Sequence, residues 1–190
     1  MKCSVFIATS TDGFIAKPDG NIDWLMAAGN SQVDLGDEAD MGFNHYIKSV
    51  DCMIMGRKCM EMIDSMNLTS DQWPYGELPI YVLSNSLKDV PSGLKDKVNM
   101  YSGDIKALIS RLEKQGHKHA YIDGGNTIQG FIDLELINEL TITRAPVLLG
   151  EGISLFGKTS KDIKLEQSQV KSFANDFVQE SYTVNYTNHK

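Results

Sequence analysis

The sequence predicts an α/β fold with a central mixed sheet, and three observations support that prediction. Short apolar runs typical of buried strands alternate with segments of helical periodicity over most of the chain. Two segments of alternating polar and apolar residues then close the chain, which is the pattern of an antiparallel hairpin. A length of 190 residues with 42% hydrophobic residues suits a single domain with a sizeable core, and we find no linker or internal repeat.

The first third of the chain is predicted to form two strands and two helices around a long loop. Residues 2–9 read as a buried first strand. Two turn signals, Asp12-Gly13 and Pro18-Asp19-Gly20-Asn21, lie in a loop that runs to about Trp24, and a loop of this length is typical of a ligand lid. The next elements are a helix over residues 37–48, a strand over 52–55 that ends at Gly56, and a helix over 58–66.

The rest of the chain continues the alternation and then pairs two strands. The predicted elements are a strand over residues 80–83, a helix from the N-cap Asp104 to Lys114 with Gly116 beyond its end, a strand over 120–122, a helix to about Phe131, and a strand over 140–149 interrupted by Pro146. The closing hairpin pairs residues 163–170 with 177–187 around Asn175-Asp176.

Composition excludes several classes of function. A net charge of −7 argues against a nucleic-acid partner, because no basic surplus is present to neutralise phosphates. Cys3, Cys52 and Cys59 are odd in number and contain no C-x-x-C, and the four histidines show no metal-ligand spacing, so we expect neither disulfides nor a metal. The apolar run at residues 5–8 is too short for a signal peptide, and no run is long enough to span a membrane. We therefore expect a cytoplasmic protein.

Three of the predicted strand ends carry unusual residues, namely Gly56-Arg57-Lys58, Ser84-Asn85 and Gly124-Gly125-Asn126-Thr127. In an open α/β sheet, ligands bind beyond the carboxyl ends of the strands, where helix N-termini offer free N–H groups. A glycine pair lets the backbone approach a pyrophosphate closely, and Asn126 and Thr127 can donate further hydrogen bonds. The alternative is that the glycines only shape a tight turn between strand and helix. The residues alone leave both interpretations open.

Five segments, taken in their order and spacing, resemble the dihydrofolate-reductase-like family, and in particular its branch similar to the reductase domain of riboflavin biosynthesis. They are residues 7–16 with Asp23-Trp24, Met55-Gly56-Arg57-Lys58, Val82-Leu83-Ser84-Asn85, Tyr121-Ile122-Asp123-Gly124-Gly125, and residues 146–152 with Leu155-Phe156. The resemblance implies a dihydrofolate-reductase-like α/β fold, with a central mixed sheet flanked by helices and a C-terminal antiparallel hairpin, that binds NADPH in extended form.

The resemblance also implies a set of site residues. Those expected at the cofactor are Ala8 and Ile15 beside the nicotinamide, Gly56, Arg57 and Lys58 around the phosphates, Ser84 and Asn85 near the adenosine 2′-phosphate, and Gly124, Gly125, Asn126, Thr127 and Ile128 at the pyrophosphate. Residues 16–24 correspond to the mobile lid, and Trp24 is expected at the substrate. Core packing is an equally good explanation for Ala8, Ile15 and Trp24.

Two residues depart from the family pattern. Cys59 stands where the family usually has threonine, which removes one hydroxyl hydrogen bond to the cofactor. Asn85 stands where many members carry arginine, which weakens the preference for NADPH over NADH. Arg57 or Lys58 can compensate for that loss.

Asp40 is the candidate catalytic and substrate-binding acid. It precedes Gly56 by 16 residues, on the predicted first helix, and this offset resembles that of the substrate-binding carboxylate of dihydrofolate reductases. A carboxylate in a dry pocket has a raised pKa and can relay a proton while the nicotinamide delivers hydride. The alternative is a solvated acid on a helix that already contains Asp37 and Glu38.

The resemblance implies an NADPH-dependent reductase, functioning as a homodimer, that acts on a pterin or on a ribosylaminopyrimidine or ribosylaminouracil phosphate. The enzyme 5-amino-6-(5-phosphoribosylamino)uracil reductase would be its nearest functional model. A non-catalytic NADP(H)-binding protein is the alternative, since fold does not fix function.

A P-loop nucleotide hydrolase is a remote alternative, because residues 152–159 match G-x-x-x-x-G-K-T. The residues after Thr159 alternate like a strand, whereas a P-loop requires a helix there. Leu155 and Phe156 are expected in the core instead.

Overall fold

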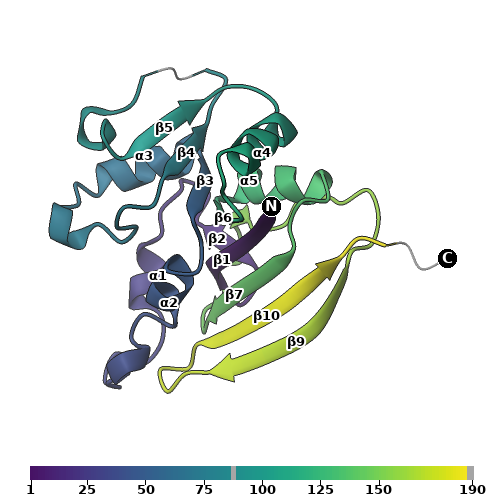
Figure 1. Ribbon diagram of the computed structural model, residues 1–190. Coiled ribbons are helices and arrows are strands. Elements are labelled where there is room, and N and C mark those ends of the chain that lie inside the picture. Colours follow the sequence, from purple (N-terminus) through teal and green to yellow (C-terminus); the bar gives the residue numbers. More distant parts are fainter. Residues whose placement is uncertain (87–88, 188–190) are drawn as a thin grey trace.

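The computed structural model describes residues 1–86 and 89–187, and a twisted sheet forms its centre (Figure 1). Eight strands follow the order β5-β4-β3-β6-β1-β7-β10-β9. In chain order they are β1 (Lys2–Ser10), β3 (Cys52–Gly56), β4 (Ile80–Leu83), β5 (Val98–Tyr101), β6 (His119–Asp123), β7 (Glu139–Ala145), β9 (Lys164–Ser172) and β10 (Val178–Asn185). All neighbouring pairs from β5 to β7 are parallel, and β10 is antiparallel to both β7 and β9. The predicted mixed sheet and closing hairpin are therefore confirmed.

Helices cover both faces of the parallel part of the sheet. On one face, α4 (Ile105–Lys114) and α5 (Gly125–Asp133) bury residues such as Leu108 and Phe131 against the strands. On the other face, α3 (Arg57–Ser65) and α2 (Phe43–Ile47) pack on Met53, Met55 and their neighbours. Burial on both faces explains why the parallel strands read as continuous apolar runs.

Local signals account for the confirmed helices. Asp104 caps α4 by accepting a hydrogen bond from the Ala107 N–H at 2.9 Å, and Gly116 beyond the end has φ +97°. α3 begins directly after Gly56, the last residue of β3, and α5 begins at Gly125, with only Gly124 between it and the end of β6. Their positions agree with the predicted ranges, because each element combines a clear start signal with an apolar stripe.

The helix predicted over residues 37–48 is wrong. A short 3-10 helix, η1 (Gly36–Glu38), is separated from α2 by Met41 and Gly42, whose φ angles are +51° and +88°. The left-handed backbone at two successive residues interrupts a helix, so Asp40 lies in the connection between two short elements.

Other elements were not predicted from the sequence. These are α1 (Asp23–Ala27), the ribbon formed by β2 (Phe14–Ala16) and β8 (Ile153–Ser154), the strand β5, and two 3-10 helices, η2 (Ser70–Gln72) and η3 (Ser92–Leu94). The strand predicted over residues 140–149 ends at Ala145, directly before Pro146. No helix among the described residues is both long and apolar enough to cross a membrane.

A third hydrophobic cluster joins the segment after β2 to the closing hairpin. Trp24, Ala145, Phe173 and Phe177 form its buried centre. Gln179 Nε2, on β10, also donates a hydrogen bond of 3.0 Å to the carbonyl of Met41, which adds a polar link between this segment and the hairpin.

Candidate functional site

The predicted phosphate-binding residues gather at the carboxyl edge of the parallel strands. In the register of the sheet, Met55 of β3 lies opposite Asp123 of β6, and Gly56 lies opposite Leu83 of β4. The first residues after these three strands therefore follow one another along the edge. The structure places Gly56, Ser84 and Gly124 in this row, as the sequence predicted.

Close packing explains the glycines at two of these strand ends. A Cβ atom on Gly56 would lie 2.8 Å from Thr127 Oγ1, and one on Gly125 would lie 2.8 Å from Ile15 Cδ1. Gly124 has φ +91°, and its Cβ would overlap the Cys59 sulfur. The starts of α3 and α5 thus touch each other and the β2 segment. Close packing therefore accounts for Gly56 and Gly125, and the positive φ of Gly124 agrees with the alternative of a tight turn, whether or not a phosphate also binds there.

Two helix N-termini and two cations lie at this edge. The first N–H groups of α3 and α5 have no acceptor within their own helices, which makes each start a suitable place for an anion. Lys58 and Asn126 are exposed, whereas the Arg57 guanidinium pairs with Glu61 at 3.2 Å. Ile128 is fully buried and its N–H donates to the Gly124 carbonyl at 2.8 Å, so it shapes the start of α5 from within the core.

Ser84 and Asn85 lie where β4 and β5 end. The Ser84 N–H donates to the carbonyl of Tyr101 at 3.0 Å, which extends the pairing of these strands by one residue. Ser102 Oγ donates to Asn85 Oδ1 at 3.2 Å. The Asn85 side chain is exposed and carries no charge, so Arg57 and Lys58 are the two cations among the predicted cofactor residues.

The predicted nicotinamide side is built around the end of β1. Ala8 is half-buried and lies opposite Thr143 of β7, and Ile15 of β2 reaches the start of α5. Asp12 links the loop after β1 to the loop after β7. Its carboxylate accepts hydrogen bonds from Ser10 Oγ at 2.6 Å and from the Gly150 N–H at 2.7 Å, and these bonds lower its pKa.

Trp24 packs in the third hydrophobic cluster. Its side chain is 8% exposed, and its indole Nε1 has no hydrogen-bond partner among the described residues. Ala16, at the other end of the predicted lid, is also buried, while residues 17–19 between them are exposed. The packing matches the core alternative for Trp24. Its predicted contact with substrate stays a prediction.

The expected environment of Asp40 is wrong. Its carboxylate accepts hydrogen bonds from the N–H groups of Gly42 at 2.9 Å and Asn44 at 2.8 Å, and so caps the start of α2. These bonds stabilise the charged form and lower the pKa of Asp40, whereas a buried general acid needs a raised pKa. A catalytic role for Asp40 stays a prediction, without the dry pocket on which it was based.

Asp123, at the end of β6, is a second candidate acid, which the sequence interpretation did not single out. Tyr121 Oη donates hydrogen bonds to the Phe6 carbonyl at 3.0 Å and to Asp123 Oδ1 at 3.3 Å. Burial raises the pKa of Asp123, although hydrogen bonds from the Gly124 N–H, Tyr121 and the Cys59 thiol oppose that effect. A partly buried carboxyl group with a raised pKa beside a row of strand ends is suited to bind or move a proton. Its signal lay in the Tyr121–Gly125 motif, where it was treated only as part of the turn.

Aromatic rings surround the Tyr121–Asp123 pair on the α2 side of the sheet. The Tyr46 ring lies 5.1 Å from that of Tyr121, and Phe43 lies 6.3 Å from Tyr75, each edge to face. Burial raises the pKa values of Tyr75 and Tyr121, and the charge of Asp123 adds to that effect. The arrangement is an apolar wall with one acidic group, a combination suited to a planar ring that carries N–H donors.

The P-loop interpretation of residues 152–159 fails in the structure. Residues 153–154 form β8, which pairs with β2, and no helix follows Thr159 among the described residues. Leu155 is buried in the core, as expected, but Phe156 is 39% exposed, so that part of the expectation is wrong.

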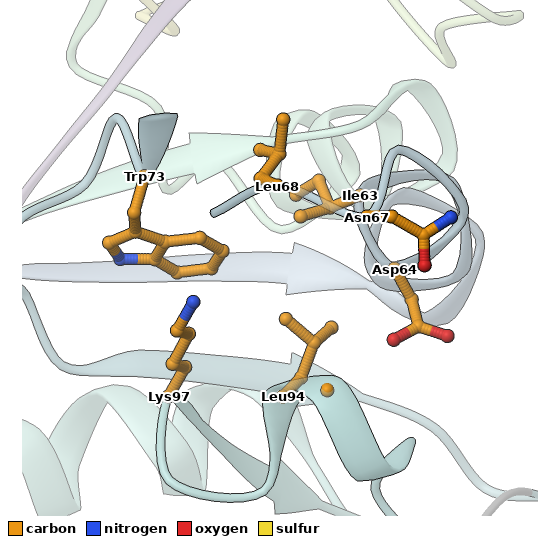
Figure 2. A pocket seen from close by; sticks show the side chains of 8 residues that line it. Ile63, Asp64, Asn67, Leu68, Trp73, Leu94 and Lys97 are labelled. Carbon is orange, nitrogen blue, oxygen red and sulfur yellow. The ribbon is translucent and has the colours of Figure 1, made fainter. Parts of the chain in front are cut away.

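A separate cavity of about 200 Å³ lies away from this edge (Figure 2). It is bounded by the end of α3, Trp73 and the turn that precedes β5, which places it near the amino ends of the strands. The Lys97 ammonium lies 4.2 Å from the centre of the Trp73 ring. None of the predicted site residues lines it.

Comparisons with known proteins agree with the predicted fold. The family model described as the RibD C-terminal domain matches residues 2–179. YwjB from Bacillus subtilis (strain 168) is 32% identical over 174 residues, which cover 90% of this chain and 92% of YwjB.

Two solved structures extend the comparison. A protein from Shewanella sp. PV-4, named for riboflavin biosynthesis, has a TM-score of 0.85 and 37% identity, with 97% of this chain and 99% of that chain covered. Dihydrofolate reductase from Enterococcus faecalis, solved with NADP(H), has a TM-score of 0.62 at 13% identity, with 97% and 96% covered. The second likeness concerns the fold alone, and it confirms a dihydrofolate-reductase-like arrangement.

Proposed function

The chain belongs to the RibD C-terminal domain family, and from that premise we propose that it is an NADPH-dependent reductase. The proposed substrate is a pterin or a ribosylaminopyrimidine or ribosylaminouracil phosphate. The observation that carries the proposal is the row of strand ends at the carboxyl edge. There, two helix N-termini adjoin the partly buried carboxyl group of Asp123, so that anion-binding and proton-binding groups lie side by side.

The residues at this edge fit an extended dinucleotide. The free N–H groups at the starts of α3 and α5 suit its pyrophosphate, with Asn126 and Thr127 in the first turn of α5. Lys58 is exposed and free to approach a phosphate, whereas Arg57 must first loosen its contact with Glu61. Because Asn85 is neutral, selectivity for the 2′-phosphate would depend on these two cations.

NADPH, when bound, supplies the hydride from its nicotinamide ring. The small side chain of Ala8 on β1 and the apolar Ile15 would bound the nicotinamide. Asp123, held by Tyr121, would accept hydrogen bonds from the ring N–H or amino groups of the substrate. Its raised pKa would also allow it to hold the proton that reduction of a C=N bond requires.

The family branch also leads us to propose a homodimer. Leu148, just beyond β7, is 71% exposed, and the edge strand β9 is exposed along most of its length. Either feature can contribute to contacts between two copies of the chain. Light scattering at micromolar concentration tests this: a dimer mass is expected, and a monomer mass would contradict it.

Oxidation of NADPH in the presence of candidate ring substrates tests the main proposal. We expect turnover with a dihydropterin or with a ribosylaminopyrimidine or ribosylaminouracil phosphate, and none with ATP. Binding of NADPH without oxidation by any of these compounds would indicate a non-catalytic binding protein. Failure to bind NADPH at all would remove the proposal.

A further inference from the structure

A mixed group of potential metal ligands lies at the opposite, amino edge of the sheet, where β3 and β6 begin. Asp51, Cys52 and His117 each offer one ligand atom, and these atoms all lie within 4.8 Å of one another. His117 Nδ1 is 3.4 Å from Asp51 Oδ1. We infer that these three side chains form a binding site for a divalent cation of the zinc type, independent of the proposed reductase site.

The chemistry of the three donors selects the class of cation. A thiolate, an imidazole and a carboxylate together match zinc and its neighbours in the transition series, whereas Mg²⁺ and Ca²⁺ prefer oxygen donors alone. Zinc–ligand bonds of roughly 2.0–2.3 Å place the donors of a tetrahedral site roughly 3.3–3.8 Å apart. His117 Nδ1 and Asp51 Oδ1, 3.4 Å apart, already have this spacing, and any donor pair that is separated by up to 4.8 Å has to close by at most roughly 1.5 Å.

The surrounding structure already orients these donors. The Asp51 carboxylate accepts hydrogen bonds from the backbone N–H groups of Lys118 at 2.8 Å and His119 at 3.3 Å. The His117 ring packs edge to face against Tyr81, with 6.4 Å between the ring centres. Outer contacts of this kind fix the orientation of metal ligands and strengthen binding.

The position of His117 at the end of a helix also favours a cation electrostatically. The residue follows the end of α4, and its N–H donates to the carbonyl of Leu112 at 3.1 Å. The carbonyl end of a helix carries a partial negative charge, which favours a nearby cation.

The three side chains form a partly open site. Cys52 is fully buried and forms its floor, while the side chains of Asp51 and His117 are 43% and 18% exposed. A cation held between them would keep its remaining position toward solvent, where water can complete the coordination. Binding would displace the thiol proton of Cys52, because the thiolate is the ligand.

Titration of the metal-free, untagged full chain with Zn²⁺ tests the site. We expect one Zn²⁺ per chain, and a loss of affinity of more than about tenfold in Cys52→Ser and in His117→Gln. Cys59→Ser and His45→Gln are the matched controls, since both residues lie outside the group, and we expect affinities within about twofold of the wild type. Co²⁺ should give a sulfur-to-metal charge-transfer band in the wild type that Cys52→Ser lacks.

Two results would overturn the inference: no Zn²⁺ bound by the wild type, or equal affinity in the wild type and His117→Gln. His117 lies near the surface, so that variant decides the matter even if Cys52→Ser does not fold. Neither result bears on NADPH binding, which involves the opposite edge of the sheet.

Discussion

The proposed phosphate side and the proposed substrate side of the candidate site are built in different ways. The phosphate side consists of short consecutive segments, each running from a strand end into the first turn of a helix, as at Gly56–Lys58 and Gly124–Thr127. The substrate side is assembled from side chains that are distant in sequence, namely Phe43, Tyr75, Tyr121 and Asp123. Local sequence motifs therefore predict the phosphate side well and the substrate side poorly.

The same difference separates the two candidate acids, Asp40 and Asp123. The prediction for Asp40 rests on an offset along one expected helix, but two left-handed residues interrupt that helix and leave the carboxylate as a cap. Asp123 acquires its environment from β6, β1 and α3, which only the folded chain brings together. The following predictions test this division of roles.

Exchange of Asp123 for asparagine should have the largest effect on activity. The variant keeps the shape of the side chain but loses the proton-binding group, so turnover should fall by roughly 10²-fold or more. NADPH binding should change little, because the phosphate contacts lie on other residues. Steady-state kinetics on the identified substrate, with a parallel NADPH titration, measure both quantities.

Asp40→Asn is the matched comparison for that experiment. If the roles are as proposed, its turnover stays within about twofold of the wild type, because asparagine can also cap a helix. A full loss of turnover in Asp40→Asn together with wild-type turnover in Asp123→Asn would reverse the assignment.

The same Asp123 variant should be more stable than the wild type at neutral pH. Burial raises the pKa of Asp123 above its ordinary value of 3.8, so the folded state favours the protonated form and the charged form opposes folding. The advantage of asparagine should shrink as the pH falls toward that ordinary value. Urea unfolding at neutral pH and at about pH 4 measures the difference. If the stability advantage of Asp123→Asn over the wild type grew on acidification, the raised pKa assigned to Asp123 would be contradicted.

Substitution of Gly124 by alanine should destabilise the fold by roughly 2–3 kcal/mol, because a positive φ and a clash with Cys59 act together. Gly20→Ala is the control. Gly20 has nearly the same φ, +88° against +91°, but nothing lies within 4 Å of its Cβ position, so only about 1 kcal/mol is expected. Equal losses of unfolding free energy in the two variants would mean that backbone strain alone requires the glycine.

Lys58→Gln should weaken NADPH binding by about five- to tenfold at low salt and by less at high salt, because salt would screen the proposed ion pair between Lys58 and a phosphate. Glu61→Gln should strengthen NADPH binding, by a smaller factor, because it releases Arg57 from its 3.2 Å contact with Glu61. NADH binding should respond less to either change. Equal changes in the affinities for NADPH and NADH would show that neither Arg57 nor Lys58 contacts the 2′-phosphate.

Asp40→Ala should cost about 0.5–1 kcal/mol of stability through loss of the cap on α2. Because those hydrogen bonds lower the pKa of Asp40, its contribution is present above the unfolded value of 3.8 and is lost as the pH falls through the folded value. Unfolding curves of both proteins should therefore converge in acid. A difference in unfolding free energy between Asp40→Ala and the wild type that persists in acid would indicate lost packing instead.

The sequence predicted most of the sheet and its longer helices, for a physical reason. Apolar runs such as Cys52–Met55 are bounded by their own stop signals, and Asp104 marks the start of α4. β5 escaped prediction because only Val98 among its four residues is buried, and β2 and β8 are too short to show a period. The group of Asp51, Cys52 and His117 also escaped prediction, since residues distant in sequence meet only after β3 and β6 have paired.

Calorimetric titration of the wild type with NADPH, at low and at raised salt, tests the central claim most directly. The account predicts one NADPH per chain, bound more tightly than NADH, with an affinity that falls as salt rises and falls again in Lys58→Gln. The absence of binding, or an affinity that neither salt nor Lys58→Gln alters, would contradict the assignment of the phosphate side to the starts of α3 and α5.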